Sequence, residues 1–153
     1  MQEKDSFDPR VFLPYLLNQA SEESSLMFQK EYKNRYGMLR TEWRVLFQIG
    51  NYGPLTATDI VVRAKIHKTK VSRAVQKLVD RRFLKRERSE TDRRVELLSL
   101  TSAGQTAYVD LIAVAKTYDE KLAAYFTTGE VALLRMMLTR LAGIEGGLEA
   151  GLE

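Results

Sequence analysis

The chain contains no cysteine, which excludes disulfide bonds, thiolate metal sites, cysteine nucleophiles and thiol redox switches. Its single histidine, His67, has no second histidine or cysteine with which to share a metal ion, so no metal site is expected. The same lack of partners leaves no catalytic triad, and the chain has no phosphate-cradling glycine loop and no zinc-protease pattern. We therefore expect neither an enzyme nor a bound cofactor.

Long apolar runs are also missing. No stretch approaches the roughly 18 apolar residues that a membrane helix needs, and the polar segment Met1–Asp5 does not resemble a signal peptide. The chain has 153 residues, of which 44% are hydrophobic and 29% charged, as is typical of a soluble globular domain. These features predict a cytoplasmic protein that does not bind a membrane.

Positive charge is concentrated in one segment. Between Arg63 and Arg94 there are 13 Lys or Arg residues against 4 Asp or Glu, a net charge of +9, whereas the rest of the chain carries −5. A basic block on a mildly acidic body is expected of a face that binds a polyanion. A solvated basic surface without a partner explains the charge equally well, so other features must decide.

Glycine and proline are sparse, with 9 and 3 copies, which favours long helices. Apolar residues at helical spacing predict helices at about 8–36, 41–50, 56–64, 68–82, 102–126 and 127–144. Two strand-like runs at 84–88 and 95–100 flank a charged tip, which predicts a β-hairpin. The two helices between 56 and 82 form a helix-turn-helix, and the hairpin makes it a winged helix. The expected fold class is mainly α with a small β-hairpin.

Several ends of these helices have local signals. Gly37 is expected to end the first helix, Thr41 to cap the second, and Thr101 or Ser102 to cap the fifth. The pair Gly146–Gly147 is expected to weaken the end of the last helix. Two further helices begin with capping-box spacing, namely Thr56 with Asp59 and Thr127 with Glu130.

The helix at 68–82 has the composition of a recognition helix. Its apolar stripe is narrow, and its other faces are polar or basic, which permits close approach to DNA. Arg73 has the groups for a bidentate contact to guanine and Gln76 for one to adenine. The stripe consists of Val71, Val75, Leu78 and Val79. Base edges or phosphates are within reach of the short side chains Thr69 and Ser72, and phosphate contacts are assigned to Lys68, Lys70 and Lys77. His67 is expected to cap this helix or to touch a phosphate.

The hairpin tip carries Asp92, Arg93 and Arg94. Because side chains two residues apart share one side of an extended chain, Asp92 is expected to hold the Arg94 guanidinium in one orientation. A guanidinium held in this way suits insertion into a narrow minor groove, while Arg93 would reach a flanking phosphate. Arg86 on the first strand is also assigned to the DNA-binding surface. The alternative is a surface ion pair of little consequence.

In this order, the parts resemble the MarR family of bacterial transcription regulators over nearly the whole chain. The Asp-Arg-Arg wing followed by Leu-Thr-x-x-Gly is the most specific element, and Phe83 departs from the glycine that many relatives have. The features that carry the resemblance are the helical N-terminal segment, Leu39–Leu46, Thr58–Ile60, His67–Arg73, Leu78, Arg81–Leu84, Asp92–Arg94 and Leu100–Gly104.

The resemblance implies a homodimer built from one MarR-like domain, 1–153. Helices within about 8–36 and 102–147 would intertwine as the dimerisation part, and about 38–100 would form the winged helix-turn-helix lobe. Two-fold symmetry then implies a roughly palindromic operator on double-stranded DNA, with half-sites on the order of 10 base pairs apart. Repression is the family's usual mode.

The resemblance also implies a small-molecule effector, such as an aromatic acid or aromatic thioester, bound between the two parts. The implied contacts are Arg44 for an anionic group and Tyr15, Asn18 and Phe47 for stacking or hydrogen bonds. The alternative is that Arg44 is a surface residue and that the other three pack or are exposed. Two other functions stay open: a nonspecific or architectural DNA-binding protein, and a winged helix used for protein contacts.

Overall fold

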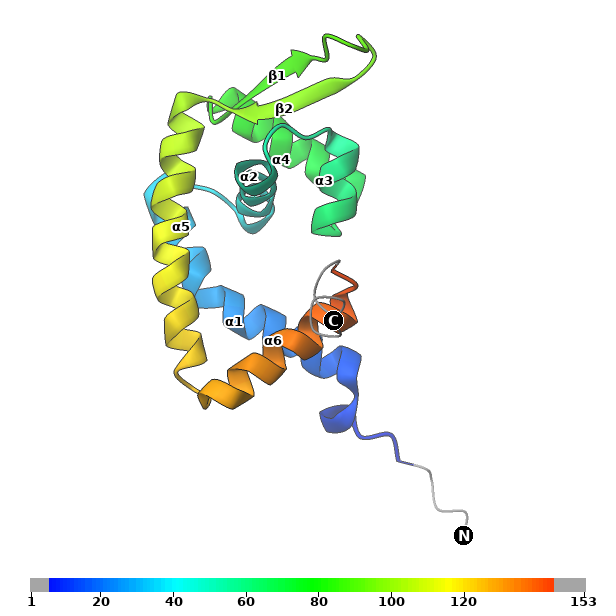
Figure 1. Cartoon of the computed structure of the whole chain (residues 1–153), viewed down its shortest axis with the longest axis vertical. Helices are drawn as coiled ribbons and strands as arrows, with labels where there is room; N and C mark the ends of the chain where they lie inside the picture. The colour runs from blue at the N-terminus through cyan, green and yellow to red at the C-terminus, as the bar shows by residue number, and fades with distance from the viewer. Residues whose placement is uncertain (1–5, 145–153) are drawn as a thin grey trace, which may run out of the picture. The chain divides into compact units, whose positions relative to one another are not determined.

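The computed structural model describes residues 6–144, which form a short 3-10 helix, α-helices and one antiparallel hairpin (Figure 1). The elements are η1 (Pro9–Val11), α1 (Leu13–Tyr36), α2 (Arg40–Tyr52), α3 (Ala57–Ala64), α4 (Lys68–Asp80), β1 (Leu84–Arg88), β2 (Glu96–Leu100), α5 (Ser102–Ala123) and α6 (Thr128–Ala142). The predicted fold class is confirmed. The chain divides into two compact units, residues up to Val114 and residues from Ala115, with the boundary inside α5. Among the described helices, none combines the length and apolarity needed to cross a bilayer.

The predicted first helix is divided into two. The Asp8 carboxylate accepts the Arg10 backbone amide at 2.9 Å and caps the 3-10 helix. Phe12 is extended, with φ −83° and ψ 111°, and separates this turn from α1. Pro14 lies in the first turn of α1, where a missing amide hydrogen costs no hydrogen bond. Gly37 ends α1 in the left-handed conformation at φ 62°, as predicted.

The prediction that Thr41 caps the second helix is wrong. The helix begins one residue earlier, at Arg40, and its N-cap is Leu39, which is extended and provides no side-chain hydrogen bond. The Glu42 carboxylate compensates, because it reaches back and accepts the Leu39 backbone amide. An acidic residue in the first turn therefore replaces the cap that Thr41 seemed to offer.

Three other helices begin as predicted. In each case a threonine hydroxyl accepts a backbone amide three residues later: Thr56 from Asp59 at 3.0 Å, Thr101 from Gly104 at 3.0 Å and Thr127 from Glu130 at 3.2 Å. Helices α4 and α5 end earlier than predicted, at Asp80 and Ala123. The predicted weakening at Gly146–Gly147 lies outside the described residues.

The hydrophobic core lies in the unit that ends at Val114. It joins one face each of α2, α3 and α4 to side chains from α1, β1, β2 and α5. The sequence leaves open which face of the second strand is buried, and the structure shows that Leu98 lies in the core. Leu98 also exchanges both backbone hydrogen bonds with Leu55, at 2.8 and 3.1 Å, which attaches β2 to the start of α3.

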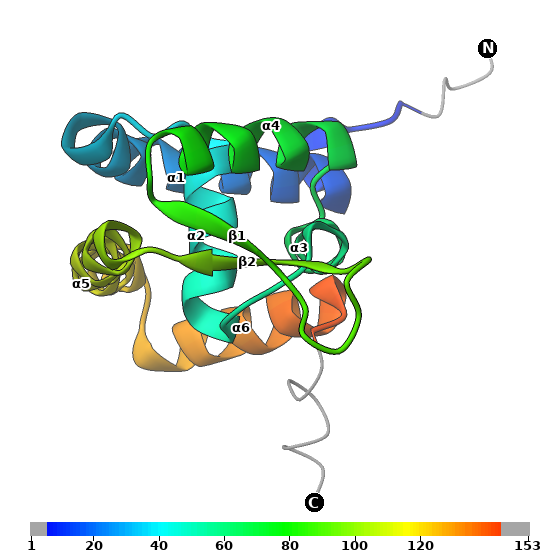
Figure 2. The same cartoon turned by 90° about the horizontal axis from the view of Figure 1, so that it is seen from above.

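The hairpin is in register from Leu84 opposite Leu100 to Arg88 opposite Glu96. Strand β1 contacts α4, and strand β2 contacts α2 and α3, so the hairpin crosses the helix-turn-helix (Figure 2). Its base is therefore held by the core, while its tip extends beyond the helices. This arrangement brings the basic face of α4 and the charged tip into one unit of the chain.

Candidate nucleic-acid interface

Helix α4 presents one apolar face to the core and a polar face to solvent. Its buried residues are Val71, Ala74, Val75 and Leu78, so the predicted stripe is confirmed except that Val79 is only half-buried. The predicted contact residues at this helix are all exposed, namely His67, Lys68, Thr69, Lys70, Ser72, Arg73, Gln76 and Lys77. A docked helix with an exposed basic face is the arrangement that major-groove binding requires.

His67 is the N-cap of α4. Its Nδ1 atom accepts the Thr69 backbone amide at 3.2 Å, so the predicted capping role is confirmed. The turn before it contains Lys65 in the left-handed conformation, at φ 54°. With Nδ1 accepting, Nε2 is the ring atom that carries the proton in the neutral form. A phosphate contact from Nε2 stays a prediction.

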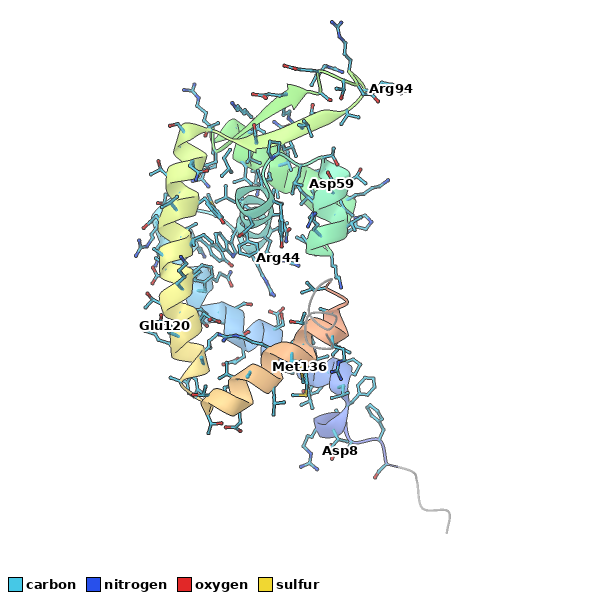
Figure 3. The ribbon with its side chains drawn as sticks, viewed as in Figure 1. Asp8, Arg44, Asp59, Arg94, Glu120 and Met136 are labelled. Carbon is cyan, nitrogen blue, oxygen red and sulfur yellow. The ribbon has the colours of Figure 1, made fainter. Side chains whose placement is uncertain are left out.

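The predicted pair at the hairpin tip is confirmed. Asp92 Oδ1 accepts both the backbone amide and Nε of Arg94, at 3.0 and 3.1 Å, and Oδ2 accepts Nη2 at 3.3 Å. These hydrogen bonds from Arg94 lower the pKa of the Asp92 carboxyl group below its ordinary value. The Arg94 side chain is 91% exposed and lies at the tip of the hairpin (Figure 3). The guanidinium is therefore oriented and accessible.

The reason predicted for this pair, an extended chain, is wrong. The Val95 amide donates to the Asp92 carbonyl at 3.0 Å, so the residues form a tight turn. An aspartate side chain that accepts the amide two residues later is a common feature of such turns. Arg93 is exposed on the same turn, and its carbonyl accepts Arg88 Nη1 at 2.7 Å, which braces the tip from β1.

Gln76 and Arg86, which the sequence assigns separately to DNA binding, contact each other. Arg86 Nη2 donates to Gln76 Oε1 at 2.8 Å, and Arg86 Nη1 donates to Glu96 Oε1 at 2.8 Å. Gln76 Nε2 in turn donates to Asp80 Oδ1 at 2.7 Å. The four-residue spacing between Gln76 and Asp80 is a signal in the sequence, since such pairs meet on a helix. The contacts of Arg86 depend on the packing of β1 against α4.

A second feature lies in the same unit, between α2 and α3. It is an open depression of about 310 Å³, lined by Trp43, Arg44, Phe47, Gln48, Arg63 and Ala64. Of the predicted ligand residues, Arg44 and Phe47 lie here, whereas the exposed α1 residues Tyr15 and Asn18 are not part of this lining. The Trp43 ring contacts the Phe47 ring, with centroids 5.6 Å apart.

Arg44 is half-buried and already has a protein partner. Its Nη2 atom donates to the carbonyl of Ala64, the last residue of α3, and so satisfies one of the free carbonyls at that helix end. Burial, and secondarily the charge of Arg40, lower the pKa of the Arg44 guanidinium. In Figure 3 Arg44 projects from the side of α2 that lies away from the hairpin.

The sequence does not predict Gln48 or Arg63 as part of this depression. Gln48 Oε1 is buried and has no hydrogen-bond partner among the residues that the structure describes. The Arg63 guanidinium lies over the Tyr52 ring, 4.3 Å from its centroid. The depression therefore combines two aromatic rings and two cations, while Gln48 Oε1 is covered by the protein. That chemistry suits an aromatic anion.

The segment that contains the winged helix is similar to known proteins. Residues 36–95 match the model described as MarR family. A Bacillus subtilis HTH-type transcriptional regulator, YwoH, described as uncharacterized, is 25% identical over 114 residues, which cover 73% of this chain and 82% of that protein. The match to the family model spans α2, α3, α4 and the hairpin tip.

Solved structures show the same fold. A MarR/EmrR family transcriptional regulator from Acinetobacter sp. ADP1 has a TM-score of 0.81 at 22% identity, covering 90% of this chain and 96% of that one. BpsR from Bordetella bronchiseptica, whose DNA binding is regulated by 6-hydroxynicotinic acid, has a TM-score of 0.75 at 19% identity, covering 85% and 98%. The predicted winged helix fold is confirmed by these likenesses.

Proposed function

We propose that this chain is a transcriptional regulator of the MarR family, whose model matches residues 36–95, and that it is a sequence-specific, homodimeric repressor acting on DNA in the cytoplasm. The observation that carries the proposal is the winged helix itself, in which Arg73 is exposed on α4 and Arg94 is oriented at the hairpin tip. The relatives are described as transcriptional regulators, which agrees with this assignment.

Exposed apolar side chains support the homodimer. On and just after α6, large apolar side chains are between 37% and 62% exposed, including Leu134, Met137, Leu138 and Leu141. A face of this composition is expected to be covered by another protein surface, and a second copy is the partner that the family suggests. Two-fold symmetry then favours a pseudo-palindromic operator, with half-sites about 10 base pairs apart.

Selection of binding sites from random duplexes tests the proposal. The selected duplex is expected to bind roughly 10³-fold more tightly than unrelated duplex at moderate salt, because base contacts add to phosphate contacts. Sedimentation should show a dimer at the same protein concentration. Equal affinity for both duplexes would contradict a regulator and favour an architectural binder. Little salt dependence would favour a winged helix used for protein contacts.

We further propose that a small aromatic carboxylate occupies the depression between α2 and α3 and releases DNA. Trp43 and Phe47 offer ring surfaces, and Arg44 offers a cation. The ligand would lower operator affinity by favouring a subunit arrangement whose half-site spacing no longer matches the operator. Aromatic thioesters are a second candidate class.

Arg44→Ala is expected to abolish the preference for acids over amides among such ligands. In the parent, hydroxylated benzoic acids should release operator at roughly tenfold lower concentration than the matched benzamides, because a charge-assisted hydrogen bond contributes about 1.5–3 kcal/mol. Titration of operator complexes by fluorescence anisotropy measures both series. Arg40→Ala is the matched control, since Arg40 lies one turn earlier on α2 and is not part of the lining. A preference that persists in Arg44→Ala would place the carboxylate elsewhere.

A further inference from the structure

Both polar groups of the exposed Gln76 side chain form hydrogen bonds with other side chains of the protein. Its oxygen accepts Arg86 and its nitrogen donates to Asp80, and Arg86 continues to Glu96. We call these four residues the wing brace. The brace connects α4 to both strands of the hairpin through hydrogen bonds of 2.7 to 2.8 Å. Its hydrogen bonds add to the apolar packing that holds the base of the hairpin.

The brace constrains base reading by Gln76. A bidentate contact to adenine needs the amide oxygen and the amide nitrogen together, and each of them already has one hydrogen bond here, which leaves one lone pair and one amide hydrogen. Gln76 also lies in the C-terminal half of α4 (Lys68–Asp80), whereas recognition helices contact bases mainly from their N-terminal residues. The brace also fixes the direction of the Gln76 side chain, so this side chain cannot rotate to meet a base without breaking the hydrogen bonds to Asp80 and Arg86.

The brace is also poorly placed to contribute to stability. The Arg86 and Glu96 side chains are 37% and 47% exposed, and exposed ion pairs add little to the free energy of unfolding. The brace bears on geometry instead, because it joins α4, which carries Arg73, to the hairpin, whose tip carries Arg94.

We propose that Gln76 and Arg86 are positioning residues, which hold the hairpin against α4 so that Arg73 and Arg94 reach DNA at one spacing. Two contacts bind more tightly when their spacing is set before binding, since a pivoting hairpin would lose conformational freedom on association. This inference rests on the proposed function. It moves base reading to Thr69, Ser72 and Arg73 and assigns Gln76 to the orientation of the wing.

A double-mutant cycle on the selected operator tests it. Arg94→Ala is expected to weaken binding about fivefold or more in the parent but no more than about twofold in Gln76→Ala, because residues that act through one another are not additive. Gln76→Ala itself should lower affinity without relaxing the preference at any base. Independent effects, together with a relaxed preference at one adenine, would overturn the proposal and restore Gln76 as a base reader.

Two variants sharpen the cycle. Gln76→Glu with Asp80→Asn reverses donor and acceptor between these residues, keeps both hydrogen bonds of the brace and leaves the net charge unchanged. It should restore affinity to within about threefold of the parent, whereas a carboxylate offers no donor to adenine N7 and would not rescue base reading. Lys77→Ala is the control, because this exposed neighbour is outside the brace. The fold-losses in operator affinity caused by Lys77→Ala and Arg94→Ala should therefore multiply in the double variant.

A measurement without DNA separates this proposal from the proposed function. In the free protein, Gln76→Ala should lower the ¹⁵N backbone order parameters of residues 89–94, and Lys77→Ala should leave them unchanged. Unchanged order parameters in Gln76→Ala would overturn the brace whether or not the protein binds an operator. Lowered order parameters in a protein without operator specificity would support the brace and refute the regulator.

Discussion

Arg94→Ala is expected to weaken operator binding by about 1–3 kcal/mol, which corresponds to roughly 5- to 150-fold in affinity. The Arg94 side chain is 91% exposed, and two hydrogen bonds from its guanidinium to Asp92, with a third from the Arg94 backbone amide, hold its orientation before DNA arrives. Less rotational freedom is therefore lost on binding. A narrow minor groove would concentrate the negative potential that attracts such a side chain. Fluorescence anisotropy at several salt concentrations measures the loss.

Matched variants distinguish insertion of the Arg94 side chain into the minor groove from attraction between a positive charge and the phosphates. Arg93→Ala removes the neighbouring cation, and its effect is expected to be uniform across sequences and to reduce the salt slope by about 1. Asp92→Asn keeps the size of the side chain but weakens the hold on Arg94, so an intermediate loss is expected. Arg73→Ala should cost about 1–3 kcal/mol and relax one base preference. Parent-like binding by both Arg94→Ala and Arg73→Ala would refute the assignment of the surface.

Gly104→Ala is expected to lower the free energy of unfolding by about 2–4 kcal/mol, because overpacking against backbone cannot be relieved by a rotamer change. An added Cβ would lie 2.0 Å from the Phe83 carbonyl oxygen. That oxygen already accepts the Thr101 amide at 3.1 Å, and the Gly104 amide donates to the Thr101 hydroxyl. Neither backbone segment can move without breaking a hydrogen bond where α5 meets the base of the hairpin.

Gly129→Ala is the matched control. Gly129 lies in the first turn of α6, and an added Cβ would have no atom within 4 Å. Alanine there should be neutral or stabilise the protein by up to about 1 kcal/mol, since glycine is a poor helix former. Urea unfolding at one fixed protein concentration compares the midpoints, because a dimer's stability depends on concentration. Equal midpoints for the two variants would contradict the close approach at Gly104.

Local features of the chain were predicted from sequence where the signal and its cause lie within a few residues. Gly37 ends α1 because a left-handed residue is needed there, and the capping threonines satisfy amides three residues away. The failures have local causes as well. Thr41 has the chemistry of a cap, but Glu42 caps the helix from inside and moves its start to Arg40.

The Asp92–Arg94 pair was determined by the sequence by itself, since two residues that close along the chain are within reach of each other in the tight turn observed as well as in the extended chain that was predicted. Other roles required the tertiary structure. Only the packing of β1 on α4 brings Arg86 to Gln76, and only the packing of α3 on α2 brings Arg44 to the Ala64 carbonyl. The physical reason is distance along the chain. Residue types and short spacings specify which hydrogen bonds a side chain can make, but packing decides which partner is within reach.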